Sequence, residues 1–394
     1  MTGGGPRVAV VATHPIQYHA PWFRALVAEG VDLHVLFSFL PDAERQAAGF
    51  GGRFQWDVPV FDGYRWCVLR QTRKSPSLDT FAGLRSAGIG PALAALAPDA
   101  VVLTGWNALP LLQGLLVAIR LGIPTVVRGE SNALRPRATW KEIGQRALLS
   151  AYDAFVSIGK ANRTFYERNG VPPERIVDGG YFVDEEHFVA LRAKEAPRRT
   201  ELRAEWGVPE GACCFLFAGK LQAKKRPLDF VAALSAAARR LPAGAICGLI
   251  AGSGELEAET RRAAEAAAVP IAFAGFLNQQ EIGRAYAAAD GLVLPSDFEE
   301  TWGLVVNEAM LFGLPVVVSD RVGCGPDLIS DGETGLVVPF GDVSALATSL
   351  AELALDEPAR EVMGRRARAH VLDYSPRRGA EATIAAIRIA MGGD

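Results

Sequence analysis

The sequence predicts an α/β protein made of two doubly wound domains, and three observations lead to this prediction. Short apolar runs alternate with longer amphipathic segments along most of the 394 residues, a pattern typical of parallel sheets that are covered by helices on both faces. This alternation stops in the charged segment 178–203, for which we expect irregular structure, and it starts again after that segment. The chain is also longer than one ordinary hydrophobic core requires. We therefore expect one domain over residues 1–185 and a second over residues 190–370.

Individual elements are expected where an apolar run meets a longer amphipathic segment. In the first half the strand candidates are 8–12, 31–37, 100–103, 125–127 and 154–158, and the helix candidates include 21–29 and 109–121. In the second half the strand candidates are 215–218, 245–251, 271–273, 291–294 and 315–319. In the tail 374–394, the segment from Tyr374 to Met391 is predicted to form a helix of its own.

Composition and charge exclude several classes of protein. An apolar fraction of 49% and a charged fraction of 22% are those of a soluble globular protein, and a net charge of −3 gives no reason to expect nucleic acid as a partner. The N-terminus lacks the pattern of a signal peptide, and no stretch offers 18 uncharged apolar residues, so we expect no membrane span. The five scattered cysteines include no C-x-x-C pair, which favours a reducing compartment.

An apolar segment that carries three carboxylates raises the question of function. Residues 295–320 end in a strand-like run yet contain Glu299, Glu300 and Glu308, and a glutamate is seldom buried unless it is paired. A helix is expected to begin near Gly303, with Glu300 just before it and Glu308 in its second turn. A helix N-terminus attracts phosphate, and an acidic residue farther along can hold two ribose hydroxyls. The arrangement suits a nucleotide-sugar; the alternative is a surface helix whose acidic residues complement its dipole.

Three further motifs follow expected strands. The segment GKLQAKKRP (219–227) places several cations at the carboxyl end of a strand, where they can neutralise a departing diphosphate; the alternative is a solvated turn. The segments AGSGELE (251–257) and AGFLNQQEIGRAYAAAD (274–290) add a glycine turn and the approach to the glutamate-bearing loop. Ligands of open parallel sheets bind outside the carboxyl ends of the strands, so with two such sheets we expect a site in the cleft between the domains.

The order of these motifs resembles the donor half of glycosyltransferase family 4. The matching pattern is G-K-L-x3-K, A-G-S-G, G-F-L…Y-x3-D and E-E-T-W-G-L-V-V-N-E-A-M-x3-G-L-P-V-V-V-S-D, and it is strong over residues 213–350 but weaker over the first half. The family signature is two glutamates with seven residues between them, the spacing of Glu300 and Glu308. The resemblance implies a retaining, metal-independent enzyme of the GT-B architecture. That architecture has two Rossmann-like domains facing across a cleft, with a C-terminal helix that crosses back to the first.

The resemblance also implies roles for single residues. Glu308 is expected to bind the ribose hydroxyls, and Glu300 the hydroxyls of the transferred sugar. Lys220 and Lys225 are expected to contact the diphosphate, which makes Glu300, Lys220 and Lys225 the catalytic candidates. Lys220 stands where the family more often has arginine, a change that keeps the charge but loses the planar fork.

The remaining donor-binding candidates are mostly backbone positions. Phosphate oxygens are expected on the N–H groups of Gly303, Leu304 and Val305, beside Trp302, which has either a packing role or a sugar contact. The rest of the set is Gly252, Gly275, Phe276 and Leu277, and the last three are expected along the nucleobase. The expected donor is a UDP- or GDP-sugar, and no cofactor is expected.

The first half of the chain carries the acceptor-side candidates. Its first loop, residues 13–23, lacks a glycine fingerprint and holds His14 and His19. Inverting enzymes of the same architecture keep a general base after the first strand, whereas a retaining front-face reaction needs none. The glutamate signature favours retention, which leaves His14 as a wall of the acceptor site or as a hydrogen-bonded loop residue.

Two further segments should face the acceptor. Trp106 and Asn107 follow one expected strand, and Arg128 and Glu130 follow another, within the sequence RGES at 128–131. The family usually carries a histidine near the sugar at this last position, so Arg128 or Glu130 is expected to stand in for it.

The overall expectation is a retaining glycosyltransferase that needs no metal, since no D-x-D sequence and no His/Cys metal spacing occurs. The alternatives are a nucleotide-sugar-binding module, a non-transferring, epimerase-like relative, and an inverting enzyme that uses His14 or His19 as base. The acceptor is a small molecule, a lipid-linked molecule or a saccharide. The expected location is the cytoplasm. The basic segment 131–146 is either a contact with anionic lipid on the inner face of the membrane or a solvated helix face.

Overall fold

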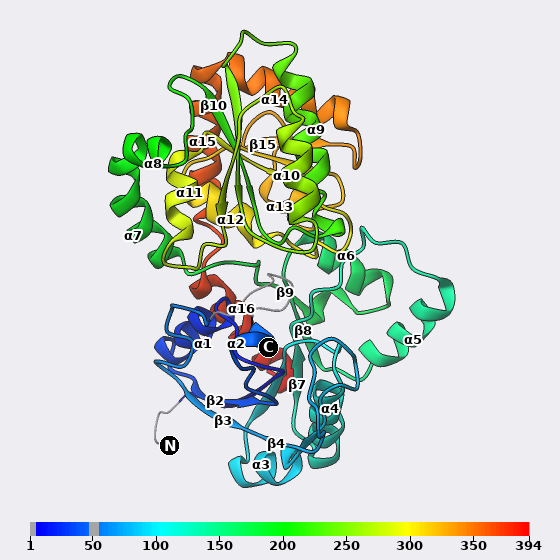
Figure 1. Ribbon diagram of the computed structural model, residues 1–394. Coiled ribbons are helices and arrows are strands. Elements are labelled where there is room, and N and C mark those ends of the chain that lie inside the picture. Colours follow the sequence, from blue (N-terminus) through cyan, green and yellow to red (C-terminus); the bar gives the residue numbers. More distant parts are fainter. Residues whose placement is uncertain (1–4, 47–54, 394) are drawn as a thin grey trace. The chain divides into compact units, whose positions relative to one another are not determined.

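The computed structural model describes residues 5–46 and 55–393 and divides the chain into two compact units (Figure 1). The first unit contains Pro59–Phe182, the chain before Ala43 and the chain from Ser375 onward. The second unit contains Val183–Tyr374 together with Ala43–Val58, a segment that the sequence pattern placed in the first domain. The chain therefore crosses between the units more than once.

The first unit is built on a seven-stranded sheet in the order β3-β2-β1-β6-β7-β8-β9. Every pairing in this sheet is parallel. Its strands are β1 (Arg7–Ala12), β2 (Asp32–Phe37), β3 (Arg65–Val68), β6 (Ala100–Leu103), β7 (Thr125–Val127), β8 (Ala154–Ser157) and β9 (Ile176–Asp178). A short antiparallel pair, β4 (Arg70–Gln71) and β5 (Ser86–Ala87), accompanies it. The strands β3 and β9 at the two edges were not predicted.

Helices cover both faces of this first sheet. The helices of this unit are α1 (His19–Ala28), α3 (Ile89–Leu96), α4 (Leu109–Leu121), α5 (Thr139–Leu149), α6 (Lys160–Arg168), the short η1 (Pro173–Arg175) and α16 (Pro376–Ala390). Successive side chains of a strand point to opposite faces, and β1 follows this rule. Val8 and Val10 pack in a core with Trp22, whereas Ala9 and Val11 pack in a second core with Leu115.

The second unit is built on a six-stranded parallel sheet in the order β12-β11-β10-β13-β14-β15. Its strands are β10 (Cys213–Ala218), β11 (Ile246–Ala251), β12 (Ile271–Gly275), β13 (Gly291–Leu294), β14 (Val316–Ser319) and β15 (Gly335–Val338). Its helices are α2 (Ala43–Gln46), α7 (Glu185–Glu195), η2 (Ala196–Arg198), α8 (Arg199–Glu205), η3 (Ala223–Lys225), α9 (Pro227–Ala238), α10 (Glu257–Glu265), α11 (Ile282–Ala288), α12 (Leu304–Leu311), α13 (Gly325–Leu328), α14 (Val343–Leu355) and α15 (Glu357–Val371).

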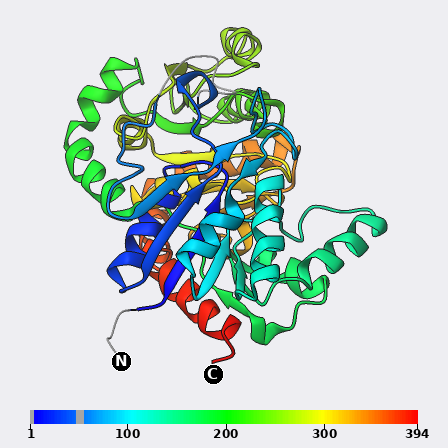
Figure 2. The same ribbon diagram turned by 90° about the horizontal axis from the view of Figure 1, so that it is seen from below.

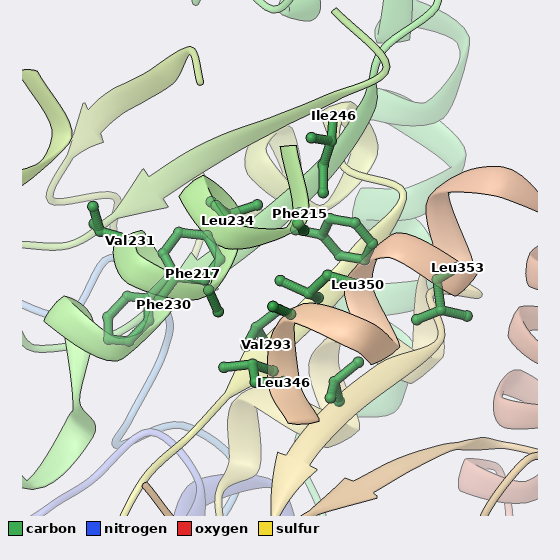
Figure 3. Packing of buried hydrophobic residues seen from close by; sticks show 14 of the residues in the cluster. Phe215, Phe217, Phe230, Val231, Leu234, Ile246, Val293, Leu346, Leu350 and Leu353 are labelled. Atoms are coloured by element: carbon green, nitrogen blue, oxygen red, sulfur yellow. The ribbon is translucent and has the colours of Figure 1, made fainter. Parts of the chain in front are cut away.

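One face of the second sheet packs on α9 and α14 through a large apolar core (Figure 3). Phe215 and Phe217 of β10 meet Phe230 of α9 and Leu350 of α14, and all four are fully buried. Burial of four such side chains stabilises the unit by several kcal/mol, at roughly 1.5–3 kcal/mol each. This core fixes β10 in the middle of the sheet, and with it the loop that follows β10.

Most of the charged segment 178–203 is helical, from Glu185 onward, which corrects the expectation that it is irregular. Asp184 caps α7 by accepting a hydrogen bond from the His187 N–H (3.2 Å). Phe188 and Leu191 are buried on one side of the helix, and α7 packs on α11 and α12. The many charged residues of this segment obscured two apolar residues three positions apart, and burial of these two side chains is enough to hold the helix against its neighbours.

The C-terminal helix α16 belongs to the first unit, as the predicted fold requires. It lies beside α1 in Figure 2 and packs on β8. The Trp22 indole N–H donates to the Thr383 hydroxyl (3.2 Å), and a Cβ at Gly379 would lie 2.1 Å from the Phe182 ring. The glycine therefore permits a close approach of α16 to the Phe182 side chain.

Candidate functional site

Four loops of the second unit begin at the same edge of its sheet, where the strands have their carboxyl ends. They follow β10, β11, β12 and β13, which are parallel neighbours, and they carry the four motifs that the sequence singled out. Direct contacts join them: the Gly252 N–H donates to the Gly275 carbonyl (2.7 Å), and the Asp297 N–H donates to the Lys224 carbonyl (2.9 Å). The structure thus gathers motifs from 219 to 303 into one group.

The glycine turn after β11 is a close crossing of two backbones. Gly252 and Gly254 have φ angles of +150° and +155°, and a Cβ at Gly252 would lie 1.9 Å from the Gly219 carbonyl oxygen. The Leu221 N–H donates to a carbonyl of this turn (2.9 Å). Because only glycine tolerates both the conformation and the contact, the A-G-S-G motif holds the lysine-bearing loop 219–227 in position.

Lys225 and Glu300 form an ion pair, although they come from different loops. Each side chain is only 14% exposed. Lys225 ends the η3 turn after β10, and the Glu300 N–H donates to the Asp297 carbonyl (3.0 Å) in the loop after β13. The structure therefore brings together two of the three residues that were expected to be catalytic.

The third catalytic candidate, Lys220, lies in the same concentration of positive charge. Burial lowers the pKa of Lys220, and the charges of Lys224 and Lys225 lower this pKa further. Like charges that act on one another in this way lie close together. Such a cluster of ammonium groups suits a polyanion such as a diphosphate.

Glu308 lies in the second turn of α12 and is only 2% exposed. Its Oε2 atom accepts a hydrogen bond from the hydroxyl of Tyr286, a buried residue of α11 (2.7 Å). Tyr286 is a functional candidate that sequence reasoning missed. The Y-x3-D motif contains it, but nothing in that spacing connects it to Glu308. The three carboxylates of this segment thus have different surroundings: Glu299 is exposed, Glu300 faces Lys225 and Glu308 faces Tyr286.

The start of α12 is set by Gly303, which has a φ angle of +100°. A Cβ there would lie 2.8 Å from a Leu294 methyl group and 3.5 Å from Glu300 Cγ. The first N–H groups of a helix, here those of Leu304 and Val305, have no acceptor within the helix, and the terminus favours an anion. Glu300 therefore lies beside a potential phosphate-binding turn.

Trp302 packs inside the second unit. It is buried, and its indole N–H donates to the Asn307 side-chain oxygen (2.8 Å). Gly275 ends β12 with a φ angle of +72°, and the half-buried Phe276 and Leu277 open the following loop. Their contact with a nucleobase stays a prediction.

A cavity of about 650 Å³ lies at the opposite, amino-terminal end of the second sheet, beside Cys213 and Asp290. Arg199 (2.7 Å) and Arg203 (3.0 Å) pair with Asp290, whose carboxylate also accepts from the Cys214 N–H (2.8 Å). The two guanidinium groups and the Asp290 carboxylate neutralise one another, so Asp290 of the Y-x3-D motif has a structural role.

In the first unit, the candidates Trp106 and Asn107 follow β6. Trp106 is half-buried and stacks on Phe165, with ring centroids 6.1 Å apart and planes 15° apart. A Cβ at Gly129 would lie 2.3 Å from the Trp106 ring, which ties the loop after β6 to the loop after β7. Asn107 is exposed.

Arg128 and Glu130, after β7, share one tyrosine. The Cζ atom of Arg128 lies 4.5 Å from the Tyr181 ring centroid, and the Tyr181 hydroxyl donates to Glu130 Oε1 (2.6 Å). Arg128 also lies 5.1 Å from the Trp22 centroid and 5.3 Å from the Phe182 centroid. Whether either residue replaces the family histidine stays a prediction.

The two histidines of the first loop are both hard to protonate. Burial lowers the pKa of His14 to about 4, and Nδ1 of His14 lies 2.9 Å from the Thr13 hydroxyl. Burial also lowers the pKa of His19 well below its usual value, and the charges of Arg128 and His14 add to this. Both imidazoles are therefore neutral at pH 7.

Within residues 5–46 and 55–393, no three His, Cys, Asp or Glu side chains are grouped as metal ligands. The helices of this same part of the chain include none that is long and apolar enough to cross a membrane.

Comparison with solved structures defines the class of fold. The chain is similar to a glycosyltransferase from Rickettsia africae, with a TM-score of 0.73 and 14% identity over 99% of both chains. It is also similar to Anabaena HepE, solved with UDP and glucose, with a TM-score of 0.69 and 15% identity over 97% of this chain and 98% of that one. Together with the two parallel-sheet units, these likenesses define the GT-B class, which confirms the predicted fold class.

Family models identify the chain more closely. The model described as "Glycosyl transferases group 1" matches residues 198–370, and the model described as "Glycosyl transferase 4-like domain" matches residues 16–177. The two halves of the chain thus each match a glycosyltransferase family model, and the resemblance to glycosyltransferase family 4 is confirmed.

One curated relative is D-inositol 3-phosphate glycosyltransferase from Saccharomonospora viridis, which is 36% identical over 205 residues. The match covers 49% of this chain and 46% of the relative. The chain thus spans about half the length of the curated relatives that it matches.

Proposed function

We propose that the protein is a retaining glycosyltransferase that moves a sugar from a UDP- or GDP-sugar to an acceptor hydroxyl without a metal ion. The convergence of Lys225, Glu300 and Glu308 at the carboxyl ends of β10 and β13 carries this proposal. Ligands of parallel sheets bind at this edge. The family membership and the UDP and glucose bound by HepE support a nucleotide-sugar donor.

Each part of the donor has a matching group in the second unit. Glu308, held by the Tyr286 hydroxyl, offers its carboxylate to the two ribose hydroxyls. The N-terminus of α12 and the ammonium groups of Lys220 and Lys225 receive the diphosphate. Glu300 lies beside the start of α12 and takes the hydroxyls of the sugar.

The ion pair between Lys225 and Glu300 prepares both residues for this role. When a diphosphate enters, the Lys225 ammonium turns to the stronger anion, and the Glu300 carboxylate becomes available for the sugar hydroxyls. The acceptor oxygen then bonds to the anomeric carbon on the face from which the diphosphate leaves. The leaving phosphate oxygen takes the hydroxyl proton. The lysines stabilise the charge that develops on the diphosphate, which is the task that a metal ion has in other transferases.

The lowered pKa values of the histidines support retention over inversion. An efficient general base has a pKa near the working pH, and His14, with a pKa of about 4, is too weak a base for an acceptor hydroxyl. The pKa of His19 is also lowered well below its usual value, so His19 is likewise too weak a base. A front-face reaction does not require either of them.

The test is incubation with UDP- and GDP-sugars and a mixture of acceptors, in the presence of EDTA. We expect release of the nucleoside diphosphate and a product that keeps the anomeric configuration of the donor, as read by NMR. Binding without release would favour a nucleotide-sugar-binding module. A free epimerised sugar nucleotide would favour an epimerase, and an inverted product would move the chemistry to a histidine.

We also propose that the reaction takes place in the cytoplasm, at an anionic membrane surface that α5 contacts. All five cysteines are free, which suits a reducing compartment. On α5, Trp140 and Ile143 are 71% and 68% exposed, Lys141 of the same helix is exposed as well, and so is Arg135, which precedes the helix. An exposed apolar stripe with basic neighbours suits a headgroup layer.

Sedimentation with vesicles tests this contact. The protein should bind vesicles that contain phosphatidylglycerol and not pure phosphatidylcholine, and I143S should weaken this binding. The control is L355S, a change at a residue of the second unit that is 66% exposed. Equal loss in both variants, or no binding at all, would contradict the contact.

A further inference from the structure

The first unit holds a buried cation that the proposed transfer does not use. Arg128 follows β7 directly and is only 3% exposed. Its Nε and Nη2 atoms are buried and have no hydrogen-bond partner. Among the residues that the structure describes, no carboxylate forms an ion pair with Arg128. A buried arginine is ordinarily paired, because an unpaired buried charge is costly.

The aromatic rings around Arg128 compensate its charge only in part. Trp22, Tyr181 and Phe182 surround the guanidinium at 4.5–5.3 Å from their centroids, and rings attract a cation electrostatically. They do not accept N–H groups as a carboxylate does. In a guanidinium, the Nε–H and one Nη2–H point the same way along one edge. The two nitrogens without partners therefore form the fork that binds a carboxylate or a phosphate through two parallel hydrogen bonds.

A second buried nitrogen without a partner belongs to a residue that shares a neighbour with Arg128. His19 is buried, and its Nδ1 atom has no hydrogen-bond partner. Its ring centroid lies 5.8 Å from that of Trp22, the ring that also contacts Arg128. Arg128 and His19 follow the carboxyl ends of β7 and β1 respectively, the edge of a parallel sheet where ligands bind.

We propose that Arg128 and His19 form a binding site for an anionic group of a substrate, either a phosphate monoester or a carboxylate. This proposal rests on the proposed function, because it specifies one of the two molecules between which the sugar moves. The anionic group belongs either to the acceptor or to the transferred sugar, as in a uronic acid. The Arg128 fork binds two of its oxygens, and His19 donates to the group from Nδ1.

The experiment uses the full chain in two arms, both read by calorimetry. In the acceptor arm, the donor site is first saturated with UDP, and inorganic phosphate is then titrated. In the donor arm, the affinities for UDP-glucuronate and UDP-glucose are compared. Each arm is run on the wild type, on R128Q and on R137Q. Arg137 is a matched control, because it also packs on a ring, that of Phe165 (4.6 Å), but its Nη1 atom already donates to the Asn132 carbonyl (2.6 Å).

In one arm we expect R128Q to weaken binding of the anionic probe about tenfold to a hundredfold, since a hydrogen bond to a charged group contributes about 1.5–3 kcal/mol. R137Q should bind as the wild type does. The arm that responds identifies the source of the anion. The proposal is overturned if R128Q binds both anionic probes as tightly as the wild type does, or if R137Q loses as much.

Two further measurements keep this result interpretable. Where R128Q does not fold, R128K keeps the charge and loses the fork. A loss of at least threefold then supports the proposal, and an unchanged affinity overturns it. Affinity for UDP alone, measured on the same variants, should stay unchanged, because it reports on the donor site. If the wild type binds neither UDP nor GDP, the proposed function fails, whereas loss of anion binding alone leaves it standing.

Discussion

The charged side chains of the two candidate sites differ in how they are paired. In the second unit, Lys225 meets Glu300, and Glu308 meets Tyr286. In the first unit, Arg128 and His19 have buried nitrogens without partners. In the donor half, the protein's own side chains therefore hold the charged groups in place, since a buried charge must be paired to be stable. The first unit leaves its pairing to a ligand.

The largest effect should come from the cation of the donor half. Replacement of Lys225 by alanine should lower kcat about 10²–10³-fold, because it removes one preorganised charge from the departing diphosphate. The measurement is release of nucleoside diphosphate at saturating donor. Lys194→Ala, which changes a mostly exposed lysine of α7, should leave the rate near that of the wild type. A variant at Lys225 that is folded and fully active would show that the ion pair is only structural.

The two glutamates should separate binding from catalysis. Glu308→Ala should weaken UDP binding about tenfold to a hundredfold, because ribose is held alike in the ground state and the transition state. Glu300→Ala should bind UDP nearly as the wild type does and lower kcat instead, since UDP has no sugar to lose.

Calorimetry with UDP, beside kinetics with the sugar donor, checks both halves of this prediction. Glu299→Ala serves as control, because its side chain is exposed in the same loop. Equal loss of UDP affinity in the Glu300 and Glu308 variants would remove the distinction between a sugar contact and a ribose contact.

A smaller effect should follow from removal of the Tyr286 hydroxyl. Tyr286→Phe keeps the ring contact with Phe312, at 5.3 Å between centroids, and removes the hydrogen bond to Glu308. We expect UDP to bind about fivefold to tenfold more weakly, in line with about 1 kcal/mol for one hydrogen bond. Tyr374→Phe is the matched control, because the Tyr374 hydroxyl donates to a backbone carbonyl (3.4 Å). An unchanged affinity would mean that Glu308 needs no orientation by Tyr286.

The smallest effect on the reaction should come from the first unit. Since the pKa of His14 is lowered to about 4, His14→Gln should leave the dependence of kcat on pH unchanged between pH 6 and 8. Its effect on stability has a definite sign. The unfolded chain binds more protons than the folded one between pH 6.5 and 4, so wild-type stability falls as the pH is lowered through this range.

The measurement is urea unfolding at pH 7 and at pH 4.5. His14→Gln should lose less stability between these two values than the wild type, and the lowered pKa of His19 leaves part of the loss in place. An equal loss in both proteins would show that His14 is protonated freely in the folded state. A kcat that titrates with His14 near pH 7 would restore it as a base.

The sequence by itself determined the parallel-sheet class, the pair of domains and the four donor motifs. These features are local: strand and helix periods repeat over a few residues, and Gly252 and Gly303 are required by backbone conformations at single positions. Only the tertiary structure decided which side chains meet. The pairing of Lys225 with Glu300 depends on β10 lying beside β13. The rings around Arg128 come from Trp22 and Tyr181, which are far apart in the sequence. The order of strands in a sheet follows from the packing of whole elements, which no short stretch of sequence encodes.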